Sequence, residues 1–336
     1  MTRYSARRWG VRAAALVAAA TILVGCSDAK STEAETSTEA EVTSEAAAPQ
    51  KLLALDEFAA LNALTLGVKP DTVFATLQSQ AAKEILQSEG IEVIDKPTFF
   101  QSPDIEQIAA VGPDRILLSD VGSLTSIVPQ ANEIAPTTVL AYAAPWREVI
   151  ATTADALGKQ TEADAVVARL EAKFGEVSGE VAAQPQTLSV LVGFSGGIYT
   201  VIPSSPMSSI IEEAGFGRPQ AELDAKVGPN TGVATSSVSA ENVGAHVADA
   251  MVVTSGNIYD GALVHANPLF SEIPAVTAGR TADVSGELWF GSYPFAVYWI
   301  LEDLHALADR SLAGTDLQAE IAADSDAVAR WKAFSA

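Results

Sequence analysis

The sequence predicts an α/β fold of two three-layer lobes, with mainly parallel sheets, joined by one long α-helix. Short apolar runs alternate with helix-like segments, which is typical of parallel sheets with helical crossovers. The segment DIEQIAAVGPDRILLSD at 104–120 recurs in weaker form 135 positions later, as SAENVGAHVADAMVVTS at 239–255. A long helical stretch without proline lies between the two copies. We therefore expect a first lobe over 51–160, a connecting helix over 161–183 and a second lobe over 184–336.

Each copy of the repeat predicts a short helix, a turn and a buried strand. The apolar runs at 116–118 and 251–253 align, and such continuous runs are typical of parallel strands covered on both faces. Each helix begins with an acid, Glu106 in the first copy and Glu241 in the second. The positive end of a helix dipole favours a carboxylate there, so a single such glutamate is most often only a solvated first-turn acid. Its recurrence at matching places in two lobes points to a function.

The remaining elements follow in chain order. In the first lobe, we expect a strand, a turn and a helix over 51–67, strands at 71–78, 91–95 and 136–141, and helices at 79–90 and 124–133. The connector over 161–183 would be ~34 Å long at the rise of an α-helix, which is enough for a rigid link between lobes; an ordinary crossover helix is the alternative. In the second lobe, we expect strands at 188–194 and 281–285, and helices at 205–215, 295–310 and 316–334.

The N-terminal 26 residues predict a secretory signal. Four arginines precede an apolar run at 13–24 that is too short to span a bilayer, and Cys26, the only cysteine, closes the segment. This end resembles a bacterial lipobox, which implies cleavage before Cys26 and lipid attachment to its sulfur; an ordinary signal peptide is the alternative. Residues 27–50 lack aromatics and predict a disordered tether. The expected location is the cell membrane, lipid-anchored, on its extracytoplasmic side.

Composition excludes several classes of function. The formal net charge of −22 argues against nucleic acid and against electrostatic membrane binding. The three histidines lack ligand partners at metal spacing, and no P-loop, CxxC or complete GxGxxG is present. We therefore expect no metal site, no cofactor and no catalytic residues.

Aromatic residues gather in the loops that follow the predicted strands. In open α/β sheets, ligands bind outside the carboxyl ends of the strands, so aromatics from both lobes would face one cleft. Taken singly, each of them is more often a lid over a local core. The expected ligand-binding residues are Phe58, Phe100, Tyr142, Trp146, Arg147, Tyr199, Tyr259, Trp289 and Tyr293.

A competing signal is the GFSGG sequence at 193–197, which matches the nucleophile elbow of a serine hydrolase with Ser195 as nucleophile. His265 or His305 would complete a triad. An elbow must lead directly into a helix, whereas a strand-like segment follows here. A secreted hydrolase is therefore kept as the alternative from another class.

Several segments together resemble the periplasmic-binding family that serves ABC importers of ferric siderophores, haem and cobalamin. Beside the two repeat copies they are ANEIAPTTV, WREVIATTADALGKQTEA, PMSSIIEEAGF and PLFSEIPAVTAGRTADV. The resemblance implies two α/β lobes joined by a long helix. It also implies that a glutamate on each lobe, at the positions of Glu106 and Glu241, docks with arginines of the two permease subunits.

The resemblance implies a monomeric, lipid-anchored protein that captures a ferric siderophore and delivers it to an ABC permease dimer. The cargo is a transported ligand, and no bond is made or broken. Haem or cobalamin is the alternative cargo. Basic candidates for the cleft are sparse, namely Arg147, Arg218 and Lys226, so a neutral or cationic hydroxamate complex is favoured over an anionic catecholate.

Overall fold

The computed structural model describes residues 51–96, 98–227, 234–256, 258–321 and 327–336. The expected signal peptide, the tether and the lipidation residue Cys26 lie outside these ranges. Within them, no helix combines the length and the hydropathy that crossing a membrane requires.

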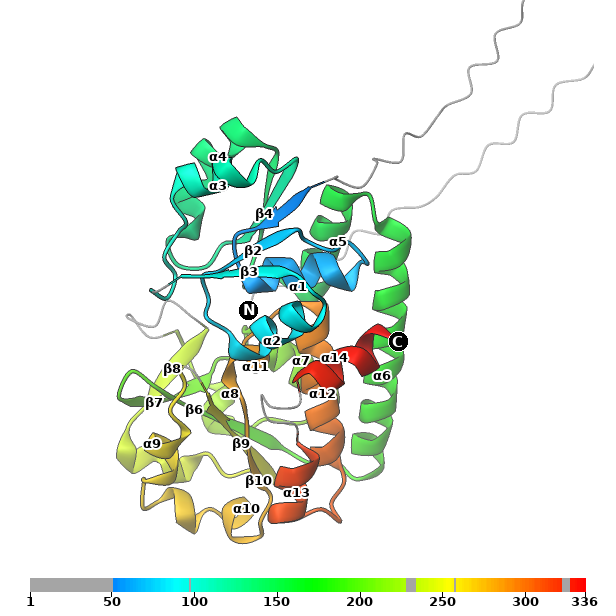
Figure 1. The fold of residues 1–336 in the computed structure, drawn as a ribbon. Coiled ribbons are helices and arrows are strands. Elements are labelled where there is room, and N and C mark those ends of the chain that lie inside the picture. The colour runs from blue at the N-terminus through cyan, green and yellow to red at the C-terminus, as the bar shows by residue number, and fades with distance from the viewer. Residues whose placement is uncertain (1–50, 97, 228–233, 257, 322–326) are drawn as a thin grey trace, which may run out of the picture. The chain divides into compact units, whose positions relative to one another are not determined.

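The first lobe is built on a five-stranded, fully parallel sheet in the order β3-β2-β1-β4-β5. The crossover helices α1 and α2 pack against each other, and α3 packs against α4. Figure 1 shows α3 and α4 on one face of this sheet and α1 and α2 on the other. The strands are β1 (Leu52–Ala54), β2 (Thr72–Ala75), β3 (Glu92–Asp95), β4 (Arg115–Ser119) and β5 (Thr137–Leu140). The helices are α1 (Glu57–Thr65), α2 (Gln80–Ser88), α3 (Ile105–Val111), the 3-10 helix η1 (Leu124–Ile127), α4 (Val128–Ile134) and α5 (Trp146–Leu157).

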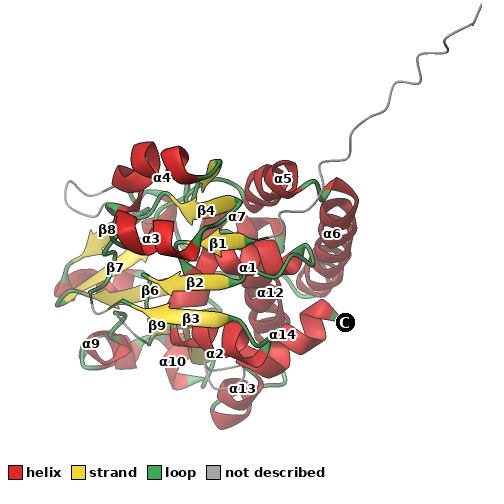
Figure 2. Cartoon of the chain, turned by 45° about the horizontal axis from the view of Figure 1, so that its top comes forward, coloured by secondary structure: helices red, strands yellow, loops and turns green. Residues whose placement is uncertain are grey.

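The second lobe has a five-stranded sheet in the order β10-β9-β6-β7-β8. Only β7 runs against its neighbours, because a two-residue turn with positive φ at Ser195 and Gly196 folds it back on β6. The two repeat copies occupy equivalent places, with β4 beside β1 and β9 beside β6. The strands are β6 (Leu188–Phe194), β7 (Gly197–Val201), β8 (Thr235–Val238), β9 (Ala250–Ser255) and β10 (Thr281–Ser285). The predicted α/β class with mainly parallel sheets is confirmed, and Figure 2 shows the strands between layers of helices.

The helices of the second lobe differ from the prediction, and the four short helices α8 to α11 were not predicted. The repeat helix η2 is a 3-10 helix rather than an α-helix, and the single helix expected over 316–334 is wrong, because α13 ends at Glu320 and α14 begins at Ala327. The helices are α7 (Pro206–Glu213), α8 (Gln220–Leu223), η2 (Ala240–Ala245), α9 (Gly261–His265), η3 (Phe270–Glu272), α10 (Pro274–Thr277), α11 (Gly286–Trp289), α12 (Pro294–Ala308), α13 (Thr315–Glu320) and α14 (Ala327–Ser335).

The long helix α6 (Gln160–Ala183) follows the first sheet and precedes the second. Its buried residues at helical spacing, among them Leu170, Phe174 and Val177, form a stripe that packs on α5 and α12. Figure 1 shows α6 running alongside α12. The C-terminal helix α14 also crosses between the lobes, because it packs on α2 of the first lobe and on α12 of the second.

Candidate ligand-binding site

Two adjacent buried acids organise the strand ends of the first lobe. The carboxylate of Asp56 caps α1 by accepting from the backbone N–H of Ala59 at 2.8 Å. It also accepts from the N–H and the hydroxyl of Ser119, at the end of β4, at 2.6 and 2.9 Å. Glu57 accepts from two backbone N–H groups that follow β2, at 2.9 and 3.0 Å. The two acids therefore fix the ends of β1, β2 and β4 relative to one another.

Burial shifts the pKa of both acids upward. It raises the pKa of Glu57 to about 8, against the lowering effect of the backbone N–H groups, and it also raises the pKa of Asp56. Asp56 and Glu57 were not among the ligand-binding residues expected from the sequence. The signal that could have found them is the pair of acids directly after the first apolar run, at the strand end where ligands bind in α/β folds.

A first group of aromatic rings joins the two lobes. The ring of Phe58, at the start of α1, lies 5.8 Å from that of Tyr142 after β5 and 4.9 Å from that of Tyr293, which precedes α12. Beside these rings, the hydroxyl of Ser292 donates a hydrogen bond to the carbonyl oxygen of Ala144. The segment 286–293 of the second lobe, here called the aromatic loop, therefore rests directly on the first lobe.

A second group of rings belongs to the second lobe alone. Tyr259, after β9, stacks on Phe290 of the aromatic loop, with centroids 5.1 Å apart and an interplanar angle of 3°. Phe194 lies 6.2 Å from Tyr259 and 6.4 Å from Tyr199, and it is 36% exposed. A methyl group on Gly286 would lie 2.3 Å from the ring of Tyr259, so the close approach requires glycine at this position. Together the two groups bring the loops after β1, β5, β6, β9 and β10 into ring contacts.

The electrostatic environment of these rings is acidic. Burial is the largest cause that raises the pKa of Tyr142, Tyr259 and Tyr293, and the nearby carboxylate of Glu287 also raises all three. The three phenols therefore stay neutral at physiological pH. Asp56 adds to the effect at Tyr142 and Tyr293. The hydroxyl of Tyr293 is buried and finds no hydrogen-bond partner among the described residues. Glu287 lies two positions before Trp289; the aromatic residues of this segment were expected to bind ligand, and the acid was not.

Five of the expected ligand residues have other surroundings than the sequence suggested. Phe58 and Tyr293 are 5% and 2% exposed and pack between the lobes, and the other three pack on neighbouring elements. Trp289 is 0% and Trp146 is 3% exposed, so both indoles lie in the core. Trp146 stacks on Phe174 of α6, with centroids 6.3 Å apart. Arg147 lies over the ring of Trp146 at 4.3 Å and forms ion pairs with Glu213 at 2.7 Å and with Glu171 on α6 at 3.4 Å. These side chains support the loops that carry Tyr142 and Tyr293.

Phe100 lies beside the ends of two strands. Its ring is half-buried and 3.7 Å from that of Phe99, its backbone N–H donates to the carbonyl of Thr76 at 2.8 Å, and its side chain covers Gly122. Its φ of +58° is unusual for a bulky residue, which indicates that the surrounding loops hold this turn in place.

The two repeat glutamates are both exposed. Glu106 is in the first turn of α3, and Glu241 is in the first turn of η2. Each side chain is therefore accessible to a partner.

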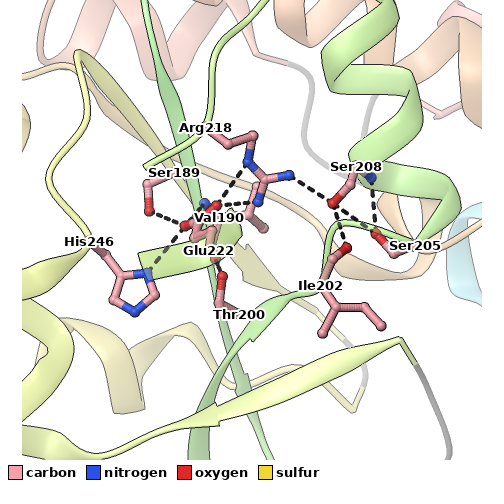
Figure 3. Close-up of polar contacts among 9 residues, drawn as sticks. All are labelled: Ser189, Val190, Thr200, Ile202, Ser205, Ser208, Arg218, Glu222 and His246. Carbon is pink, nitrogen blue, oxygen red and sulfur yellow. Dashed lines mark hydrogen bonds and ion pairs between the residues drawn. The ribbon is translucent and has the colours of Figure 1, made fainter. Parts of the chain in front are cut away.

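The basic candidate Arg218 is a buried structural residue rather than a surface cation. Its guanidinium pairs with Glu222, and it donates to the hydroxyl of Ser208 at 2.8 Å (Figure 3). Glu222 also accepts from the hydroxyl of Ser189 at 2.6 Å, and its carboxylate lies 3.3 Å from Nδ1 of His246. Lys226, the other basic candidate, is exposed. The buried cluster ties α8 to β6 and to the segment before β9.

Replacing Glu222 by glutamine is expected to destabilise the protein at pH 7 by about 2 kcal/mol, because a buried cation then loses its counter-charge. Burial raises the pKa of Glu222, but His246, Arg218 and Ser189 outweigh it, so the pKa is lower than usual. The stabilisation is therefore present above the unfolded-state pKa and is lost as the pH falls through the folded-state value. Urea unfolding at pH 7 and pH 3 should show the difference between variant and wild type shrinking in acid. The exposed acid Glu133, changed to glutamine, should show little effect at either pH; a constant difference for Glu222 would contradict this account.

The structure does not support the hydrolase alternative. Ser195 is in the hairpin turn between β6 and β7, whereas a nucleophile elbow leads into a helix. His265 lies 2.8 Å from Asp283 on β10, and His305 lies 2.8 Å from Glu180 on α6. Within the described ranges, no cluster of three histidine, cysteine or acidic side chains could hold a metal ion.

Comparison with known proteins agrees with this architecture. The ferric enterobactin-binding periplasmic protein FepB of Escherichia coli is 24% identical over 219 residues, which are 62% of this chain and 68% of that protein. The petrobactin-binding protein YclQ of Bacillus subtilis has a TM-score of 0.66 at 16% identity, covering 79% of this chain and 93% of its own. SirA of Staphylococcus aureus, complexed with staphyloferrin B, has a TM-score of 0.62 at 20% identity, covering 78% and 94%.

These solved structures share the fold of this chain. The family model described as "Periplasmic binding protein" matches residues 98–287, which include both repeat copies, α6 and the start of the aromatic loop. The chain belongs to the periplasmic binding protein family.

Proposed function

We propose that this chain is an extracytoplasmic, lipid-anchored solute-binding protein that captures a ferric siderophore and delivers it to an ABC permease. The observation that carries the proposal is the set of aromatic rings from both lobes at the strand ends of this fold, where α/β proteins bind ligands. The relative from Escherichia coli is named for ferric enterobactin, and two of the similar structures are named for petrobactin or contain staphyloferrin B. Haem or cobalamin is the alternative cargo.

The proposed binding surface consists of ring faces and edges. Tyr142, Tyr199, Tyr259 and Phe290 are partly exposed, and Phe194 is exposed, so these rings are the proposed contacts for the cargo. Flat apolar faces suit the outer surface of a chelate, in which the siderophore already supplies the ligands of the iron. Phe58 and Tyr293 lie behind them and join the lobes. The cargo leaves unchanged, and the protein acts as a monomer.

Delivery would depend on the membrane anchor at Cys26 and on the two exposed glutamates that dock with the permease. Lipidation of Cys26 would keep the protein at the membrane, and residues 27–50 would let it reach the permease. Exposed Glu106 and Glu241, one on each lobe, would contact the two permease subunits. Exposed ion pairs contribute less than ~1 kcal/mol each, so the contact would be transient, as repeated delivery requires.

A fluorescence titration of the fragment 51–336 tests the cargo. This fragment contains four tryptophans, and coloured iron complexes quench their emission by energy transfer. Ferric hydroxamates, ferric catecholates, haem and cobalamin are titrated in parallel, with the iron-free siderophores as controls. Saturable quenching by a ferric siderophore supports the proposal, saturation by haem or cobalamin alone supports the alternative cargo, and no saturation by any of the four classes rejects both.

Tyr259→Ala is expected to weaken binding of the ferric complex by at least about tenfold, because the stacked pair with Phe290 is lost from the binding surface. Tyr259→Phe keeps the ring and should bind like the wild type. Titration calorimetry of the two variants compares the ring with the hydroxyl. Equal affinity of Tyr259→Ala and the wild type would remove this residue from the site.

A further inference from the structure

The aromatic loop is held from the core side by a buried carboxylate. The indole N–H of Trp289 donates to Oδ2 of Asp303 on α12 at 2.7 Å, and both residues are 0% exposed. The other oxygen of Asp303 lies 2.7 Å from Nη1 of Arg330 on the C-terminal helix α14. A buried carboxylate with a charged partner and an N–H donor has a fixed position, because losing either contact leaves a charge without compensation.

Arg330 is itself firmly placed. Its guanidinium donates to the carbonyl of Trp299 at 3.0 Å and lies over the ring of Trp299 at 4.4 Å. The helix that carries it is anchored outside the second lobe, because Trp331 donates to Glu89, next to α2, at 2.9 Å. Arg169 of α6 donates to the carbonyl of Phe334 at 2.9 Å.

These contacts form a closed path through the molecule. It runs from α2 of the first lobe through α14 and Arg330 to Asp303, and from there through Trp289 into the aromatic loop. The loop returns to the first lobe through the hydrogen bond between Ser292 and Ala144 and through the ring contact of Tyr293. The position of the loop is therefore set from two sides.

We propose that Asp303 is a positioning residue of the ligand-binding site: through Trp289 it sets the aromatic loop, and through Arg330 it makes the position of that loop depend on the docking of α14 on the first lobe. The inference rests on the proposed function in one respect, namely that the aromatic loop contacts the cargo. Asp303 itself touches no cargo, because it is buried between α12, α14 and the loop.

The charge of Asp303 gives the arrangement a distinctive pH dependence. Burial raises the pKa of Asp303 to about 6, while Arg330 and the hydrogen bond from Trp289 lower it and Glu302 on the same helix raises it. Below that pH the carboxyl group becomes neutral, and both contacts lose their charge assistance. The loop is then held less firmly. Folding stability changes in the opposite sense, because a raised pKa in the folded state adds stability in acid that is lost as the pH rises through about 6.

Fluorine NMR of the fragment 51–336 labelled with 5-fluorotryptophan tests the coupling without any cargo. Trp289→Phe assigns the resonance of Trp289. In the wild type this resonance should shift with a midpoint near pH 6, and in Asp303→Asn the shift should be absent. Glu302→Gln is the matched control, since Glu302 is the neighbouring acid on α12 and pairs with Lys173 at 2.6 Å; it should retain the titration. A titration that persists in Asp303→Asn would overturn the coupling.

Affinity measurements test the positioning role. Asp303→Asn and Trp289→Phe are expected to weaken cargo binding at pH 7.5 by about tenfold and to abolish the further weakening that the wild type shows at pH 5. Arg330→Lys should bind better than Arg330→Met, because it keeps a cation beside Asp303. Wild-type affinity in folded Asp303→Asn would overturn the proposal. If no cargo binds the wild type, the proposed function fails, and the fluorine titration alone decides the coupling.

Discussion

Uptake of the cargo by cells is expected to fall by at least about tenfold when Glu106 and Glu241 are both replaced by alanine, while the purified double variant binds the cargo with unchanged affinity. Both acids are exposed in first turns of repeat helices, and neither takes part in the ring contacts of the proposed binding surface. Two exposed ion pairs at up to ~1 kcal/mol each correspond to about a thirtyfold change in a docking equilibrium. Because that docking is weak to begin with, losing both pairs should bring it below the level that transport needs.

The controls separate docking from net charge. Glu133→Ala with Glu272→Ala removes two other exposed acids, so it changes the net charge equally and should leave uptake intact. Each single repeat variant should show an intermediate defect, because one lobe would still dock. Uptake is measured with radioactive iron in the cargo, in cells that express each variant at equal levels. A double variant that has lost cargo affinity, or that supports normal uptake, would contradict the assignment.

Most of the fold could be predicted because the relevant signals are local. Buried parallel strands appear as short continuous apolar runs, and α6 carries a helical pattern of apolar residues over its whole length. The reversal of β7 depends on a single turn at Ser195 and Gly196, whose glycine-rich sequence was instead compared with a nucleophile elbow. The last helix was overextended, since the pattern gave no sign of the extended backbone of Ile321 that ends α13.

The candidate site was harder to predict because its contacts are distant in sequence. The sequence does not distinguish a tryptophan that lines a ligand site from one that packs on a helix. Trp146 was expected to line the site, but it packs on Phe174 of α6. The ion-pair partners of Arg147 are 24 and 66 positions away in the sequence. Asp303 contacts Arg330, which also comes much later in the sequence. The exposure of Glu106 and Glu241 could be predicted, because the first turn of a helix is usually solvated, whereas their docking role stays a prediction.

Neutral or cationic ferric complexes are expected to bind at least about a hundredfold more tightly than a strongly anionic ferric catecholate. The charged groups that act on Tyr142, Tyr259 and Tyr293 are acids, with Glu287 acting on all three. At an effective dielectric constant of 20, one pair of unit charges ~6 Å apart interacts with about 3 kcal/mol, which is more than a hundredfold in affinity. The basic residue closest in sequence to these loops, Arg147, is neutralised by Glu213 and Glu171. An anionic complex would therefore meet repulsion from these acids.

The comparison uses ferrioxamine B as a cationic complex, ferrichrome as a neutral one and ferric enterobactin as an anionic one, titrated at the same ionic strength. Glu287→Gln should reduce the preference for the cationic over the anionic complex by about tenfold, with little change for the neutral one. Glu133→Gln, which removes an exposed acid on α4, should leave all three affinities unchanged. The relative from Escherichia coli is named for ferric enterobactin. Tight binding of ferric enterobactin to this chain is the result that would contradict the prediction. Finding it would mean that the acids of this site are neutral when cargo binds, and the charge argument would then be wrong.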